Sequence, residues 1–168
     1  MSAAAWAGAG YAAWLVAGGL DFLQHARTDL AHTSGVREST WHAVQLGLVS
    51  SGVLAWLALA PGLGLLMLLG ALAAAHAVAG YLDTRTAYGC RPITPVEQHV
   101  HSVLDMAPWI AVGAVVMGQG NQARTAGWPL AWQPAAPALW LALLLPALLL
   151  AVLPWGLEFR AALRARGS

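Results

Sequence analysis

Acidic and imidazole side chains stand at helical spacing in four separate parts of this 168-residue chain. Members of each group lie mostly four or seven residues apart, so that on a helix they share one face. Carboxylate oxygens combined with imidazole nitrogens suit iron, manganese or zinc, whereas thiolates would suit iron–sulfur clusters or copper(I). The pattern predicts a metal site to which several helices contribute. Its nine candidate ligands are Asp21, His25, Glu38, His42, His76, Asp83, Glu97, His101 and Asp105.

The charge of these groups favours two metal ions over one. The set contains five carboxylates, and two divalent ions would bring about four positive charges to balance them. In helix bundles such a pair is commonly held by carboxylates that bridge and histidines that cap. Iron is the favoured metal, with zinc and manganese as alternatives. The expected direct ligands are Glu38, His42, His76, Glu97 and His101, and the expected further ligands or anchors are Asp21, His25, Asp83 and Asp105.

Explanations without a metal site remain open. The same groups would form a proton relay or an ion pathway, or only polar contacts between helices. A permeation path needs polar residues through the whole bilayer, and the opposite halves of these helices contain almost none. Haem is a weaker match, because haem histidines do not need a carboxylate one turn away on each helix.

The composition defines the environment of the helices. Hydrophobic residues make up 59% of the chain and charged residues 9%. Such a chain cannot fold in water without exposing large apolar surfaces, which indicates an integral membrane protein. Because a helix needs about 20 apolar residues to cross the hydrocarbon core, we expect a single all-α domain over 1–168 with five transmembrane helices. Their expected ranges are roughly 3–30, 36–60, 62–88, 95–118 and 137–160.

Up-and-down connections would bring the candidate ligands to one level. The helices over 3–30 and 62–88 carry theirs near the C-terminal end, and those over 36–60 and 95–118 near the N-terminal start. We therefore expect the first four helices to form a bundle around a polar metal site at one end.

The helix expected over 137–160 looks different from the others. It contains Pro146 and Pro154, has no histidine, and has Glu158 as its only acid. We expect a kinked peripheral support or a homo-oligomer contact. Its removal should therefore leave the ligands in place.

Arginine distribution predicts the orientation. Seven of the eight arginines lie around the connection of the first two helices, around that of the third and fourth, or at the end of the fifth, and only Arg124 lies on the other side. Arg37 and Arg91 flank the expected site entrance, where they would pair with an acidic substrate group or a ligand carboxylate, or only mark the orientation. Because positive charge concentrates in cytoplasmic loops, we expect an N-terminus outside a bacterial inner membrane, with the C-terminus and the metal site cytosolic. The net charge of +1 offers no basic surface for nucleic acid. The expected partner is the lipid bilayer.

The fourth helix has a clear start signal. Thr94 can cap it, Pro95 fits its first turn and Glu97 completes a capping box. In such a box the carboxylate of Glu97 turns back to the backbone. Capping would therefore compete with metal binding at this residue.

Three nearby residues are expected outside the site. His99 falls on the opposite side of its helix from Glu97 and His101. His32 lies in a turn, where a solvated histidine is expected. Cys90 is the only cysteine, so we expect a reduced, incidental thiol in a cytosolic loop.

The clusters carry a resemblance to known di-metal proteins. Histidines at the cytosolic ends of membrane helices resemble the histidine boxes of membrane fatty-acid desaturases and hydroxylases, although no H-x-x-H-H box is present. Glu38 and His42 resemble the acid–histidine motif of soluble ferritin-like di-iron proteins, with Glu-x-x-x-His in place of Glu-x-x-His. The segment Glu97-Gln-His-Val-His101 is similar to sequences of small uncharacterised bacterial membrane proteins.

The ligand types and this resemblance imply a function. The expectation is a membrane-embedded di-iron oxidoreductase that oxidises an apolar or lipid-like substrate with dioxygen. Its electrons would come from a cytosolic donor such as a ferredoxin or a reductase.

Two other functions stay open at this stage. A zinc-dependent membrane hydrolase of the ceramidase-like kind would hold zinc with three histidines and an aspartate, and a bound water would attack an amide or ester lipid. A protein that handles metal ions or protons without catalysis would use the same groups.

Overall fold

The computed structural model describes residues 3–167, which are almost entirely helical. The first half contains α1 (Ala3–Arg27), the 3₁₀ turn η1 (Leu30–His32), α2 (Gly35–Ala58) and α3 (Leu63–Ala87). The second half contains α4 (Pro95–Ala126), α5 (Pro137–Ala147), the π-helical segment η2 (Leu148–Val152) and α6 (Leu153–Ala165). Over these residues there is no strand, and a single isolated β-bridge joins Leu59 to Trp132. The predicted all-α class is confirmed.

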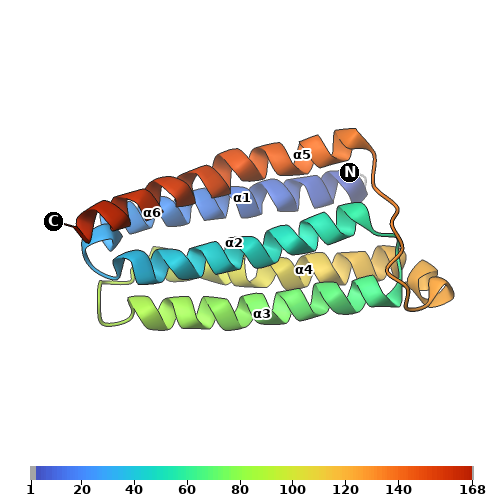
Figure 1. Cartoon of the computed structure of the whole chain (residues 1–168), viewed down its shortest axis with the longest axis horizontal. Coiled ribbons are helices and arrows are strands. Elements are labelled where there is room, and N and C mark those ends of the chain that lie inside the picture. Colours follow the sequence, from blue (N-terminus) through green and yellow to red (C-terminus); the bar gives the residue numbers. More distant parts are fainter. Residues whose placement is uncertain (1–2, 168) are drawn as a thin grey trace.

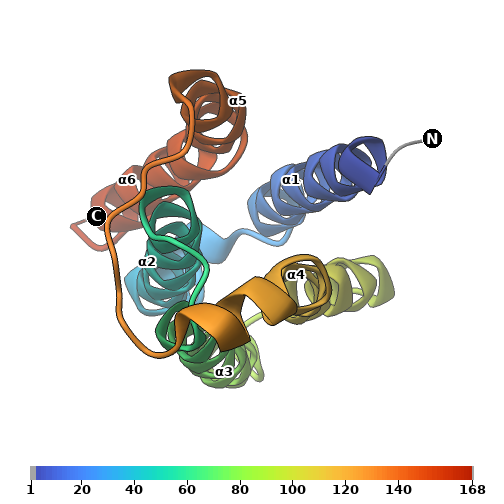
Figure 2. The same cartoon turned by 90° about the vertical axis from the view of Figure 1, so that its right-hand side faces the viewer.

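α5, η2 and α6 run on as one continuous stretch, so that the described chain has five long helical stretches. They lie side by side (Figure 1). α2 packs against α3, α3 against α4, and α4 against α1. α6 packs against α2, and both η2 and α6 contact α1. The contacts therefore form a closed ring, which the end-on view shows (Figure 2). The sequence predicts a bundle of the first four helices. The structure adds the last helical stretch to this bundle, because that stretch lies between α1 and α2.

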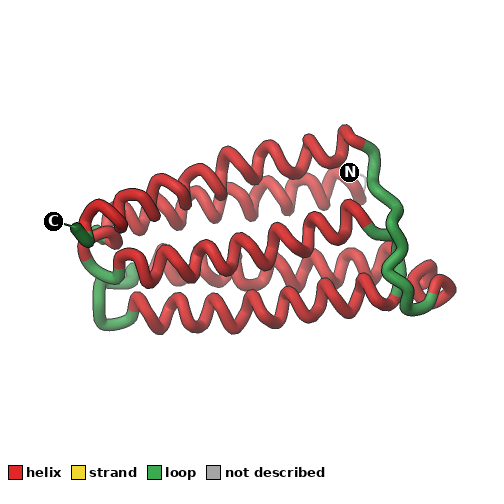
Figure 3. The backbone as a smooth tube through the Cα atoms, in the orientation of Figure 1, coloured by secondary structure: helices red, strands yellow, loops and turns green. Residues whose placement is uncertain are grey.

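Short connections bring five helix ends together. The segments that join α1 to α2 and α3 to α4 lie at the same end as the C-terminus, and the long 127–136 connection lies at the other end (Figure 3). The C-terminal ends of α1, α3 and α6 thus meet the N-terminal starts of α2 and α4. This is the common level that the ligand spacing predicted.

Four helical stretches of the described chain are long and apolar enough to cross a membrane. They are Gly35–Ala58, Leu63–Ala87, Pro95–Ala126 and Pro137–Ala165. Many large apolar side chains on them are exposed, as a lipid-facing surface requires, and they include Met67, Ile110 and Leu141. The chain thus has the character of a membrane protein. α1 has the same length as α3, 25 residues, but is not among these four.

The fourth helix is longer than predicted. We expected it to end near residue 118 because of the polar, glycine-containing segment that follows, but α4 continues to Ala126. It ends at Gly127, whose φ of 76° is a left-handed conformation suited to glycine, shortly before Pro129. Glycine and amides alone did not stop the helix, and no proline lies between residue 118 and Gly127 to end it earlier.

The end of the molecule opposite the short loops is held by backbone contacts. The N–H of Leu63 donates to the carbonyl of Gly127 at 2.7 Å, and that of Ala60 donates to Ala131 at 2.9 Å. A Cβ on Gly64 would lie 2.4 Å from the carbonyl oxygen of Trp128, so this close approach requires glycine. The 127–136 connection is thereby fixed across the ends of α2 and α3.

Candidate metal centre

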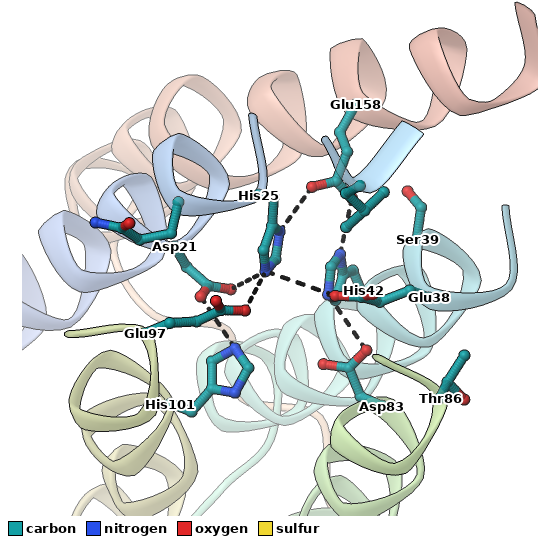
Figure 4. A network of polar contacts seen from close by, with 12 residues as sticks. Asp21, His25, Glu38, Ser39, His42, Asp83, Thr86, Glu97, His101 and Glu158 are labelled. Carbon is teal, nitrogen blue, oxygen red and sulfur yellow. Dashed lines mark hydrogen bonds and ion pairs between the residues drawn. The ribbon is translucent and has the colours of Figure 1, made fainter. Parts of the chain in front are cut away.

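A dense set of buried ionisable side chains lies inside the ring, at the end with the short loops (Figure 4). All seven of the following are at most 6% exposed: Asp21, His25, Glu38, His42, Asp83, Arg91 and Glu97. Each of the five helical stretches contributes at least one member of the set, because Glu158 of α6 joins it. Such groups are costly to bury without partners, so their contacts define what the site can do.

Two helices provide a first group of four ligand-type residues, Asp21 and His25 of α1 and Glu97 and His101 of α4. One ligand atom of each lies within 4.8 Å of those of the other three. The Nε2 atom of His25 is 3.4 Å from Asp21 Oδ2 and 3.6 Å from Glu97 Oε1. The Nε2 atom of His101 is 3.0 Å from Asp21 Oδ1. Two imidazoles and two carboxylates therefore converge on one point.

A second group lies beside the first and contains Glu38 and His42 of α2 and Asp83 of α3. The Nε2 atom of His42 is 3.3 Å from Asp83 Oδ1 and 4.0 Å from Glu38 Oε1. The same Glu38 oxygen is 3.8 Å from Nε2 of His25 in the first group. Glu38 therefore lies between the two groups.

Glu158 connects the two groups from the other side. Its Oε2 atom is 2.8 Å from Nδ1 of His25, and its Oε1 atom is 2.8 Å from Nδ1 of His42. A carboxylate accepts hydrogen bonds, so both imidazoles carry their proton on Nδ1 when neutral, and both Nε2 lone pairs point into the centre (Figure 4). The expectation that the last helix stands apart from the site is wrong, because α6 orients two of the histidines.

The two imidazoles are also fixed by ring contacts. Their planes are 2° apart and their centroids 4.6 Å apart, so they stack. The ring of Phe22 meets both edge-on, at 6.0 Å from His25 and 5.9 Å from His42. Stacking on one side and hydrogen bonding on the other leave the rings little freedom to rotate.

Arg91, from the loop between α3 and α4, is the only cation with a permanent charge in the set. Its Nε atom donates to Glu38 Oε2 at 3.1 Å, and Nη1 donates to Glu97 Oε2 at 3.0 Å and to the Thr28 hydroxyl at 2.9 Å. Its Nη2 atom donates to Oε1 of both glutamates. All five N–H groups of the guanidinium therefore have an acceptor.

Arg91 stays charged despite its burial. Burial by itself would lower the pKa of this guanidinium. The hydrogen bonds and the negative charges of Glu38 and Glu97 outweigh it and hold the pKa above its ordinary value. Arg91 thus neutralises part of the acidic cluster and fixes the two glutamates relative to each other.

The cluster remains strongly negative when its histidines are neutral. Five carboxylates lie against one guanidinium, which leaves four uncompensated negative charges. The carboxylates are those of Asp21, Glu38, Asp83, Glu97 and Glu158. An excess of this size in a buried site requires protons or bound cations.

Several buried atoms at the centre face one another as nitrogen lone pair and carboxylate oxygen, and have no hydrogen-bond partner while the histidines carry their proton on Nδ1. They are Nε2 of His25, His42 and His101 and Oδ1 of Asp21 and Asp83. An imidazole lone pair and a carboxylate oxygen repel each other unless a proton or a cation lies between them. Two ligands that share one ion at about 2.0–2.2 Å in tetrahedral geometry lie about 3.4 Å from each other. The contacts of 3.0 to 4.0 Å described above match that spacing.

Seven of the nine predicted site residues meet in these two groups, whereas His76 and Asp105 lie apart from them. His76 is buried and its Nδ1 atom has no hydrogen-bond partner. Asp105 lies against Gly80, where a Cβ would be 2.7 Å from its Oδ1 atom. Both line a cavity of about 80 Å³ that also borders the two groups. Gln45 lines the same cavity and donates to Asp83 Oδ2 at 3.2 Å.

The start of α4 shows which residue caps the helix and whether the Glu97 carboxylate takes part in capping or faces the site. The Thr94 hydroxyl accepts a hydrogen bond from the backbone N–H of Glu97 at 3.1 Å, so Thr94 is the cap. The Glu97 carboxylate does not complete the box, because it accepts from Arg91 instead. Its side chain is therefore directed into the site.

The three residues predicted to lie outside the site do so. His99 is exposed and its Nδ1 atom is 2.8 Å from the carbonyl of Pro95. His32 pairs with Asp29 at 2.7 Å on the surface, and Cys90 is exposed.

Sequence reasoning did not foresee that Glu158 takes part in the site. Glu158 is the only acid of the last helix and lies near its C-terminal end, at the predicted level of the site. That position was the available signal. Arg91, like Arg37, was expected to flank the site entrance, where it would pair with an acidic group or only mark the orientation. The structure shows that Arg91 pairs with Glu38 and Glu97, whereas Arg37 is exposed.

Comparisons with known proteins add no relationship: the chain has no significant match among protein-family models, curated proteins or solved structures.

Proposed function

We propose that this chain is a membrane-embedded protein with a centre for two metal ions, most consistent with iron, that oxidises an apolar or lipid-like substrate with dioxygen. One observation carries the metal centre. The Nδ1 atoms of His25 and His42 are bound to Glu158, so that their Nε2 atoms face a cluster which, with neutral histidines, has four excess negative charges. Two divalent cations would balance that charge and occupy the positions between the facing ligands.

The contacts divide the ligands between two ions. Asp21, His25, Glu97 and His101 would hold one ion, and Glu38, His42 and Asp83 the other. Glu38 would bridge them, since its Oε1 atom lies within 4.0 Å of Nε2 of both His25 and His42. Glu158 and Arg91 would fix the ligands without binding metal, as carboxylates behind ligand histidines do in known sites.

The ligand types support iron. The two sets contain four carboxylates and three imidazoles and no thiolate, a mixture that suits iron, manganese or zinc. A pair of iron ions with open positions would bind and reduce dioxygen. Hydroxylation of a C–H bond places one oxygen atom in the product and reduces the other to water, with two electrons and two protons. The electrons would come from a cytosolic one-electron carrier such as a ferredoxin or its reductase.

The surroundings of the site support an apolar substrate. The cavity of about 80 Å³ meets His42, Asp83 and His101 on its polar side. Its opposite wall consists largely of apolar side chains such as Trp14 and Leu46. Such a wall favours a hydrocarbon group, which would reach the site by diffusion in the bilayer.

The arrangement also supports the predicted orientation. α1 would cross the membrane as a fifth span, since it lies alongside α4 in the ring. The end that carries six exposed or half-buried arginines would then face the cytosol of a bacterial cell, with Arg124 outside. The metal centre would lie at the cytosolic boundary, within reach of the electron donor.

Elemental analysis tests the proposal. The protein is purified from cells grown with iron and zinc in excess, together with a variant that carries Glu38→Ala and His42→Ala. We expect about two iron ions per chain in the unchanged protein, and loss of most of the metal in the variant, because it removes the bridge and a histidine ligand.

His99→Ala is the matched control, because this exposed histidine contacts only the backbone carbonyl of Pro95 in its own helix. It should retain the full metal content. One zinc per chain would favour the hydrolase instead, and a metal-free protein in every preparation would contradict the proposal.

A further inference from the structure

A second cavity, of about 40 Å³, continues the first one away from the metal centre. Five residues line both: Trp14, Leu15, Leu46, Val49 and Ala151. The two cavities are therefore neighbours between α1, α2 and the last helical stretch, and together we call them the passage. It extends from the candidate ligands toward the end of the molecule that carries the 127–136 connection.

The walls of the second cavity are almost wholly apolar. Beyond the shared residues they include Val53 of α2 and Leu143, Leu144 and Val152 of the last stretch. Tyr11 closes the far part, where its hydroxyl donates to the backbone carbonyl of Leu143. The polar groups of the side chains that line this cavity are the hydroxyls of Ser50 and Tyr11 and the indole N–H of Trp14.

The shape of the passage is long and narrow. On α2 it extends from His42 to Val53, eleven residues apart, which corresponds to roughly 16 Å along a helix axis. Its volume of about 80 and 40 Å³ in the two parts leaves space for a single file of methylene-sized groups, since one water-sized group needs about 10–15 Å³.

The last helical stretch is irregular where it lines the passage. η2, at Leu148–Val152, is π-helical and contributes Ala151 and Val152 to the wall. It follows Pro146, which cannot donate a backbone hydrogen bond. π-helical turns widen a helix locally and often occur at functional sites. Here the wider turn lies beside the passage.

We propose that this passage binds the unbranched hydrocarbon tail of a single-chain lipid, with the carbon to be oxidised at the metal centre and the chain end between Val53 and Tyr11. This deepens the proposed function, on which the identity of the reaction rests, by naming its substrate class. Binding of the hydrocarbon tail itself depends only on the passage and not on the reaction. The position of Val53 would set the longest chain that fits.

Photo-crosslinking tests the proposal. Fatty alcohols of ten and of sixteen carbons, each with a diazirine at the chain end, are bound to the purified protein in lipid nanodiscs and irradiated. Labelled residues are then located by mass spectrometry. We expect label on the wall of the second cavity, lost in the presence of excess unlabelled fatty alcohol.

A set of identical substitutions on α2 makes the test specific. Val49→Phe fills the junction of the two cavities and should abolish protected labelling by both probes. Val53→Phe fills only the far part, so it should abolish labelling there by the longer probe and spare the shorter one. Val44→Phe is the control, because Val44 is 39% exposed and lines neither cavity.

Each outcome decides the inference separately from the function. Label confined to exposed residues such as Val44, label that excess fatty alcohol does not reduce, or equal labelling of all variants would overturn it. If Val49→Phe does not fold, the position of the label in the unchanged protein still decides. Metal is measured in the same samples. Protected label in a protein without iron would overturn the proposed oxidation but support the binding site for the hydrocarbon tail. Iron without protected label would support the metal centre but overturn the binding site.

Discussion

Two polar regions border the same cavity of about 80 Å³, and they are built differently. The first contains the two ligand groups with Glu158 and Arg91, where each helical stretch of the ring contributes a side chain. The second contains His76 of α3 and Asp105 of α4. Both regions have the residue types and helical spacing that predict a metal site, but only the first brings three or more ligand atoms together.

The difference teaches what assembles a site in this fold. In the first region, charges from the loop and from the last helix lie behind the candidate ligands and hold them in position. In the second region, Asp105 instead packs against the backbone of Gly80. Ligand spacing on a helix places the side chains on one face, but partners from other helices decide whether they converge.

The largest effect should come from the loop arginine of the first region. Arg91→Ala leaves Glu38 and Glu97 buried without their cation, and breaking a buried ion pair in this way costs about 3–5 kcal/mol of stability. We expect a large fall in the thermal unfolding temperature of the protein in detergent.

Arg37→Ala is the control for this change, because Arg37 is exposed at the same end of the molecule. It should change the unfolding temperature little. Equal effects of the two substitutions would show that the buried guanidinium has no special role in the first region.

A smaller effect is expected from the carboxylate behind the histidines. Glu158→Gln keeps the size of the side chain, but an amide cannot accept from both Nδ1–H groups, so one imidazole loses its orientation. Such a change behind a metal ligand lowers affinity about 10–100-fold, which titration with iron(II) under anaerobic conditions would measure.

Asp29→Asn gives the matched comparison, since Asp29 also binds a histidine Nδ1 atom, but on the surface. Its iron affinity should equal that of the unchanged protein. Unchanged affinity in Glu158→Gln would show that the last helix does not support the centre.

The smallest effect on the metal should follow from changing the second region. His76→Ala and Asp105→Asn leave all seven converging ligands in place, so the number of metal ions per chain should not change. A loss of stability of about 0.5–3 kcal/mol is expected for a substitution at such buried or half-buried positions. Loss of a metal ion in either variant would show that the two regions act as one site, and would support all nine ligands predicted from the sequence.

The sequence predicted the helices well and their ends less well. Apolar length and proline positions located the five stretches, and the capping signal at Thr94 and Pro95 placed the start of α4 correctly. The end of that helix was eight residues off, because a polar and glycine-containing segment is compatible with a helix as well as with a loop. Seven site residues were brought together as the spacing predicted, and Glu158 was assigned to a peripheral helix.

The sequence by itself determined which residues share a helix face and which helix ends carry acids and histidines. It could do so because helical hydrogen bonds join residues four apart, so that local spacing sets side-chain direction. Only the tertiary structure decided that Glu158 meets His25, 133 residues away, and that Arg91 lies between Glu38 and Glu97. Those contacts depend on which helices are neighbours in the ring, and packing between distant segments sets that order.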